Sequence, residues 1–390
     1  MNPASIDKGR GRFALMVGHC AGMVDLVGLP LWVGILIESY RFDPQQAGGL
    51  ATLFLAGIVI ASALLAPRFN RLSGRLVATA GFSISACGFF IAATTRDSAL
   101  LTGLHAICGL AAGAGLSVTH GTISQGERPH RLMAIAGVAL GVFAVIFMTF
   151  VPGIVVAHGG PSLFVVFGTV MAAAALVSFS SFPPRTGSGR VSVAQTLHSE
   201  PLPRAVWFGL AAFACVCLEH AMANSFLERV GIDHGFSHGQ IGSALLGMSI
   251  VSIFPGALAA WTENRLSIRG VLFIAPILHA ALVVVLMNAT SFPAYVAAMV
   301  LLPGLMIFMH TFTFGAIAKL DRSGRSLAAF PASIMIGSAL GPVVGGTLVK
   351  FSGYRALGSG AMVLCIIIVS CFLRLTKGRS SPVPVATSGL

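Results

Sequence analysis

The sequence predicts an all-α integral membrane protein made of two six-helix bundles that are related by a parallel pseudo-two-fold repeat. Three observations support this fold class. The chain of 390 residues is 56% hydrophobic and only 9% charged, whereas soluble domains carry about 25% charged residues. Apolar runs of about 20 residues recur along it, and a helix needs that length to cross a bilayer. The second half of the chain also repeats the first.

Twelve membrane-spanning helices are expected from the apolar runs. The seven cysteines fall inside these runs, so we expect packing residues rather than a disulfide framework. Trp32, Trp207 and Trp261 lie near span ends and are predicted to be interface anchors. The expected spans are residues 13–37, 46–66, 76–95, 98–123, 132–156, 161–182, 206–227, 240–261, 270–290, 294–318, 327–349 and 355–373.

A constant shift of 194 residues relates the two halves. The stretch "ALLAPRFNRLSGR" at Ala63–Arg75 aligns without gaps with "ALAAWTENRLSIR" at Ala257–Arg269. Six spans is an even number, so both halves enter the membrane from the same side, as in a parallel repeat. We therefore predict an N-terminal bundle over residues 1–182, a central cytoplasmic loop over 183–205 and a C-terminal bundle over 206–390.

The basic residues predict the topology. A net charge of +12 could suggest nucleic acid in a soluble protein, but most of the 24 Lys and Arg residues lie near the chain ends or in loops after even-numbered spans. The positive-inside rule then places both termini in the cytoplasm. We expect a protein of the inner (plasma) membrane with no nucleic-acid partner. The exceptions to the charge pattern are Arg41, Arg96, Arg229, Lys350 and Arg355.

Twelve spans, a 6+6 parallel repeat and basic loops after spans 2 and 8 resemble the major facilitator superfamily. The resemblance covers the whole chain. The superfamily's loop motif, Gly-x-x-x-Asp-Arg-x-Gly-Arg, is partly matched by "APRFNRLSGR". Arg71 fits the motif and Arg75 fits with a one-residue offset, while Asn70 stands in place of the Asp. The repeat extends the candidate loop motif to Arg265 and Arg269.

A second superfamily pattern, Gly-Pro-x-x-Gly-Gly, is associated with span 5 of proton-driven exporters. Here the match "GSALGPVVGG" lies in span 11. Gly341 and Pro342 are therefore candidates for a gating hinge, because proline removes one backbone hydrogen bond and invites a bend. Close packing between helices explains the glycines equally well.

Two carboxylates occupy matching places near the middle of spans 1 and 7, because adding 194 to Asp25 gives Glu219. A charged carboxylate at the bilayer centre costs about 2.5–3.5 kcal/mol, so it is expected to face a wet cavity or to take up a proton. No Lys or Arg lies deep in any span. We predict Asp25 and Glu219 as proton-coupling residues; the alternative for Asp25 is a structural bond to histidine or backbone.

The resemblance implies that spans 1, 4, 7 and 10 line a central cavity. Most of the deep titratable residues fall in these spans, which favours a role in that cavity. We predict that His105, His220 and His310 line the substrate cavity, although a lone histidine is often a packing residue. His279 in span 9 is expected to be structural.

These features predict a proton-coupled secondary active transporter of small organic molecules that works by alternating access. Phosphates and dicarboxylates usually need a fixed cation, which the spans lack. Neutral or cationic amphipathic compounds therefore fit better, with a slight preference for efflux. The alternatives are a proton-coupled uptake symporter for a small organic or monocarboxylate substrate, and a divalent metal carrier that uses Asp, Glu and His.

A membrane enzyme or primary pump is disfavoured, since the sequence contains no Gly-x-x-x-x-Gly-Lys phosphate loop. We expect no cofactor and no resident metal. The expected partners are a small-molecule substrate, protons and the lipid bilayer, and the protein is predicted to act as a monomer.

Overall fold

The computed structural model describes residues 9–65, 68, 71–184, 202–263, 265–321 and 325–377. The regular structure in these residues is helical. The helices are α1 (Gly9–Gly22), α2 (Val24–Glu38), α3 (Pro44–Leu65), α4 (Gly74–Thr94), α5 (Ser98–Ile123), α6 (Pro129–His158), α7 (Pro161–Ser181), α8 (Arg204–Asn224), α9 (Leu227–Asp233), α10 (His238–Val251), α11 (Pro255–Thr262), α12 (Ile268–Asn288), α13 (Phe292–Leu320), α14 (Arg325–Ser352) and α15 (Arg355–Lys377).

Twelve segments of the described chain are long and apolar enough to cross a membrane, which confirms the predicted spans. The protein is a multi-pass membrane protein. Two spans are broken: α1 and α2 together form Gly9–Glu38, and α10 with α11 forms His238–Ala259. The second break falls just before Pro255, the first residue of α11. Proline suits that position because the first turn of a helix does not need its missing N–H.

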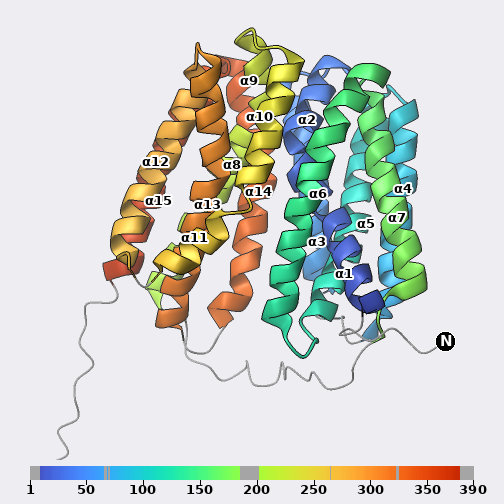
Figure 1. The fold of residues 1–390 in the computed structure, drawn as a ribbon, viewed down its shortest axis with the longest axis horizontal. Helices are drawn as coiled ribbons and strands as arrows, with labels where there is room; N and C mark the ends of the chain where they lie inside the picture. Colours follow the sequence, from blue (N-terminus) through green and yellow to red (C-terminus); the bar gives the residue numbers. More distant parts are fainter. Residues whose placement is uncertain are drawn as a thin grey trace, which may run out of the picture.

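The helices form two lobes of matching construction (Figure 1). The N-terminal lobe contains α1–α7, and the C-terminal lobe contains α8–α15. Spans 3 and 6 pack together as α4 and α7, and spans 9 and 12 do the same as α12 and α15. These equivalent pairs confirm the predicted fold class. The predicted loop 183–205 lies mostly outside the described residues, so the domain boundaries stay a prediction.

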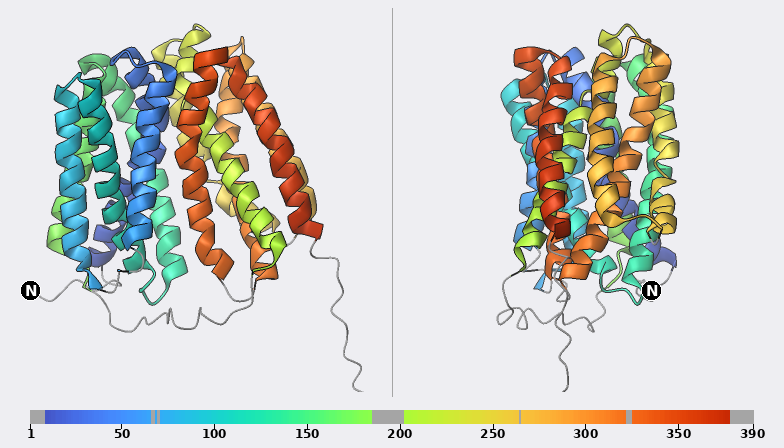
Figure 2. Two further views of the ribbon diagram at one scale, coloured as in Figure 1. Left: turned by 180° about the vertical axis from the view of Figure 1, so that it is seen from behind. Right: turned by 90° about the vertical axis from the view of Figure 1, so that its left-hand side faces the viewer.

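The lobes meet along α3 and α14, which lie side by side in the left view of Figure 2. We call the end of the bundle where α2 ends and α3 begins the upper end. The lower end is where α1 begins and α15 ends. Near the upper end, a Cβ atom on Gly48 would overlap the carbonyl oxygen of Pro342, and one on Gly346 would overlap that of Pro44. The two backbones therefore touch, which only residues without side chains allow.

Polar contacts reinforce the joint at the upper end. Lys350 Nζ lies 3.1 Å from Asp43 Oδ2, and Arg229 Nη1 lies 3.5 Å from Glu38 Oε2. Partial burial acts to raise the pKa of Asp43, but hydrogen bonds from Gln46 and Lys350 outweigh it and hold that pKa below its usual value. Both pairs are partly exposed, so each adds about 0–1 kcal/mol. The close backbone packing is the larger contribution.

The packing of Gly48 can be tested against its neighbour Gly49, beside which no atom lies within 4 Å of an added Cβ. Gly48→Ala should destabilise the protein by about 1–3 kcal/mol, because the methyl group forces α3 away from α14. Gly49→Ala should leave stability unchanged or raise it, since alanine favours helix. Thermal unfolding of both purified variants measures this, and equal unfolding temperatures would contradict the packing described here.

Candidate functional site

Asp25 lies at the break in the first span. It is in the first turn of α2, directly after α1 ends at Gly22. The side chain is 5% exposed, and its Oδ1 atom has no hydrogen-bond partner. The free N–H groups of a helix N-terminus favour a negative charge nearby. The break therefore offers Asp25 a partial compensation that an unbroken helix would withhold.

Glu219 has a different environment, although it occupies the matching position. Its Oε1 atom accepts a hydrogen bond of 2.8 Å from Nδ1 of His279 on α12. The other nitrogen of His279 lies 3.4 Å from Nδ1 of His220. All three side chains are buried within the C-terminal lobe. The structure thus joins two predicted residues, Glu219 and His220, through His279, to which the sequence assigned only a structural role.

His105 is packed inside the N-terminal lobe. Its Nε2 atom accepts a 3.2 Å hydrogen bond from the Trp32 indole, and its Nδ1 atom lies 2.7 Å from the Leu101 carbonyl oxygen. Because indole only donates, Nε2 is the acceptor and Nδ1 carries the proton. The predicted cavity role does not fit this placement. The interface role predicted for Trp32 is wrong, since the ring is 0% exposed, whereas Trp207 and Trp261 are largely exposed.

His310 is half-buried on α13, where Phe213 and Phe330 surround its ring. It borders a pocket of about 490 Å³ together with Glu263 and Lys319. The structure therefore places His310 apart from His220 and from the Glu219 group. His310 thus borders a pocket, whereas His105 and His220 are buried within their lobes.

The predicted loop residues lie at the lower end. Arg75 donates a 3.2 Å hydrogen bond to the carbonyl oxygen of Phe182. Arg75, Phe182 and Arg71 line a pocket of about 500 Å³. Arg265 covers the ring of Trp261 at 4.0 Å, and Arg269 is exposed. Asn70 lies outside the described residues. Arg75 and Arg265 thus contact neighbouring groups, and the gating role of the four arginines stays a prediction.

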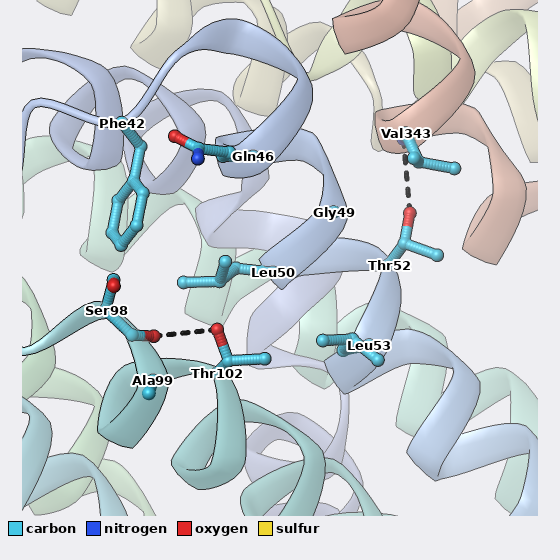
Figure 3. A pocket seen from close by; sticks show the side chains of 10 residues that line it. All are labelled: Phe42, Gln46, Gly49, Leu50, Thr52, Leu53, Ser98, Ala99, Thr102 and Val343. Atoms are coloured by element: carbon cyan, nitrogen blue, oxygen red, sulfur yellow. Dashed lines mark hydrogen bonds between the residues drawn. The ribbon is translucent and has the colours of Figure 1, made fainter.

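Gly341 and Pro342 belong to the contact surfaces of α14. A Cβ on Gly341 would lie 2.7 Å from the backbone nitrogen of Met222 on α8. The Pro342 carbonyl faces Gly48, and the next N–H, of Val343, donates a 3.1 Å hydrogen bond to Thr52 Oγ1 (Figure 3). The packing interpretation of this glycine-rich run therefore has direct support, and hinge motion at Pro342 stays a prediction.

One buried carboxylate was missed by sequence analysis. Glu228 lies on α9, one residue past the expected end of span 7, and is 8% exposed. Its Oε2 atom has no hydrogen-bond partner and presses on Gly34 of the other lobe. The sequence shows only that Glu228 lies just outside the predicted span, next to Arg229. Only the packing of α9 against α2 shows that the carboxylate is enclosed.

The pocket shown in Figure 3 contains no charged side chain, and no metal centre is found in the described residues. That pocket, of about 490 Å³, lies between α3, α5 and α14. Within the described residues, no group of three or more His, Cys, Asp or Glu side chains is placed to hold a metal ion. The candidate site therefore consists of Asp25 in the N-terminal lobe and of Glu219 with His279 and His220 in the C-terminal lobe.

Comparison with known proteins agrees with this architecture. A profile of the Major Facilitator Superfamily matches residues 15–321. The fold is similar to a bacterial homolog of the human lysosomal transporter Spinster in an inward-facing, occupied conformation (TM-score 0.77, 12% identity, covering 95% of this chain and 98% of that one). It is also similar to the nucleoside transporter NupG (TM-score 0.70, 15% identity, covering 96% and 100%). A search of curated protein sequences finds no match.

The family match and the twelve spans in two equivalent lobes identify a secondary transporter rather than an enzyme. The chain belongs to the Major Facilitator Superfamily. It acts on a small-molecule substrate in a lipid bilayer.

The bond between Trp32 and His105 makes a test of the N-terminal lobe. Trp32→Phe should cost about 1–3 kcal/mol, because it leaves the buried Nε2 of His105 without a donor. Trp207→Phe is the matched control, since Trp207 is 59% exposed, and should change stability by less than about 0.5 kcal/mol. Thermal unfolding compares the two, and an unchanged Trp32→Phe protein would show that the bond is dispensable.

Proposed function

We propose that the protein is a proton-coupled secondary transporter of cationic or neutral amphipathic molecules, with Asp25 and Glu219 as proton-exchanging groups. The observation that carries this proposal is the sign of the buried charges. In the described part of the chain, the buried carboxylates within the spans or between the lobes are Asp25, Glu219 and Glu228, and no described Lys or Arg is buried. An interior of this sign favours cations and protons and disfavours anionic substrates.

Asp25 is the better placed of the two for proton exchange. No described basic side chain pairs with it, and one of its oxygens makes no hydrogen bond. Enclosure without a basic partner makes a carboxylate charge costly, and the N-terminus of α2 offsets only part of that cost. Contact with water or a cation in another conformation would favour the ionised form. A conformational change can therefore load and release a proton at this position.

Glu219 exchanges protons by a different route in this proposal. Its contact with His279 must open, or protons must pass along His279 and His220, whose nitrogens are 3.4 Å apart. Glutamine at position 219 keeps an oxygen that can accept from His279. Glu219→Gln therefore removes the ionisable group while it preserves the bond, which makes it a suitable test substitution.

We favour efflux as the direction of transport. We also propose that the lower end and both termini lie on the cytoplasmic side of the inner membrane. The basic loop residues Arg71, Arg75, Arg265 and Arg269 belong to that end, as the positive-inside rule requires. Uptake symport is the alternative. Transport assays in liposomes of known protein orientation distinguish the two directions.

The coupling residues are tested by proton flux and substrate accumulation in liposomes, with tetraphenylphosphonium among the test compounds. Asp25→Asn and Glu219→Gln should each reduce gradient-driven transport to the level of protein-free liposomes, because neither amide titrates. Asp97→Asn is the control, since Asp97 is an exposed helix cap and asparagine caps equally well. Wild-type transport in both test variants would remove the coupling assignment.

A further inference from the structure

A cavity of about 670 Å³ lies between the two lobes at the upper end. One wall comes from α2 and α6 of the N-terminal lobe, and the other comes from α9 and α10 of the C-terminal lobe. The size falls within the range of small-molecule sites. Most of its lining is apolar, including Leu31, Ile35, Met148, Val155 and Leu245. A ligand in this cavity would touch both lobes at once.

Glu228 lines this cavity as an enclosed acidic group. Its side chain is 8% exposed, and Oε2 has no hydrogen-bond partner. The carboxylate rests on Gly34 of α2, where any side chain would collide with Oε2. Burial removes the hydration of a carboxylate, and at Oε2 no hydrogen bond replaces it, so the charge is costly even in the first turn of α9. A ligand that supplied a positive charge would remove this cost.

The neighbouring titratable groups do not supply that charge. Arg229 follows Glu228 on α9, but its guanidinium is directed to Glu38 at 3.5 Å. On α13, the Tyr295 hydroxyl donates to a backbone carbonyl of α9 at 2.7 Å. His238 on α10 is at the exposed rim of the cavity, and the residues of α6 that line it carry no titratable group. Two carboxylates, Glu228 and Glu38, therefore line the cavity, and the one nearby arginine, Arg229, is paired with Glu38.

We propose that this cavity binds an organic cation, with Glu228 as its counter-charge and the apolar lining around the body of the ligand. The cation belongs to the substrate class of the proposed function, on which this inference rests. The site is distinct from Asp25 and the Glu219 group. It is a second binding site for the transported molecule, at the upper end. Because a ligand there contacts both lobes, its binding depends on how far apart the lobes are.

Cation binding at this site is linked to the protonation of Glu228. Burial and the neighbouring Glu38 raise the pKa of Glu228 to about 8, and Arg229 only partly opposes them. The protonated, neutral form predominates below that pKa, and the carboxylate forms as the pH rises through it. Cation binding therefore releases a proton near neutral pH and strengthens as the pH increases.

The test is equilibrium binding of tritiated tetraphenylphosphonium, a permanent cation, to the purified full chain. The measurement is made with the Asp25→Asn and Glu219→Gln substitutions already present, which removes both proposed coupling carboxylates. Affinity should be about tenfold higher at about pH 9 than at about pH 7, because the ionised fraction of Glu228 rises by that factor.

Adding Glu228→Gln should abolish this pH dependence and weaken binding at the higher pH about tenfold, whereas the exposed Glu127→Gln control should do neither. Triphenylphosphine oxide, a neutral analogue, should show no pH dependence.

A second variant tests the position of the carboxylate. Gly34→Ala should displace Glu228 and weaken cation binding, while Gly137→Ala, in open space on α6, should not. If Glu228→Gln and Gly34→Ala both bind the cation with the wild-type pH dependence, the inference fails, although transport coupled through Asp25 could persist. If Asp25→Asn and Glu219→Gln both transport normally while Glu228→Gln loses binding, the coupling assignment fails and this site stands.

Discussion

The close approach of α3 and α14 is the contact on which the inter-lobe arrangement depends. Gly48 and Gly346 let the two backbones touch, and this brings the upper ends of the lobes together. The same approach places α9 on α2, where Gly34 receives the carboxylate of Glu228. Surface ion pairs at this end are partly exposed and add little. The joint therefore depends on the close packing that glycine allows more than on ion pairs.

The enclosed carboxylates show three ways in which a membrane protein accommodates a buried acid. Asp25 lies at the N-terminus of a half-helix, where free N–H groups favour negative charge. Glu219 receives a hydrogen bond from His279. Glu228 also lies in a first turn, that of α9, but its Oε2 atom accepts no hydrogen bond and rests on a glycine at the boundary between the lobes. The three acids therefore differ in the contacts that offset the cost of burying a charge.

The repeat in the sequence predicts equivalent positions but not equivalent environments. A shift of 194 relates Asp25 to Glu219, yet span 1 breaks just before Asp25 while α8 continues beyond Glu219 to Asn224. The histidine that bonds Glu219 comes from α12, far away in sequence. Likewise, nothing local to Trp32 indicates that His105 lies beside it. Partners of this kind depend on contacts between spans, which hydrophobic patterning does not encode.

The sequence by itself determined the twelve spans, the two-fold repeat and the presence of acids without deep Lys or Arg partners. These properties follow from hydropathy, length and spacing, which act on each segment independently of its neighbours. The tertiary structure alone decided which acids are paired, that Glu228 is enclosed, and that an inter-lobe cavity exists. The physical reason is that burial and pairing are properties of surfaces in contact, and helices that touch here are up to about three hundred residues apart in the chain.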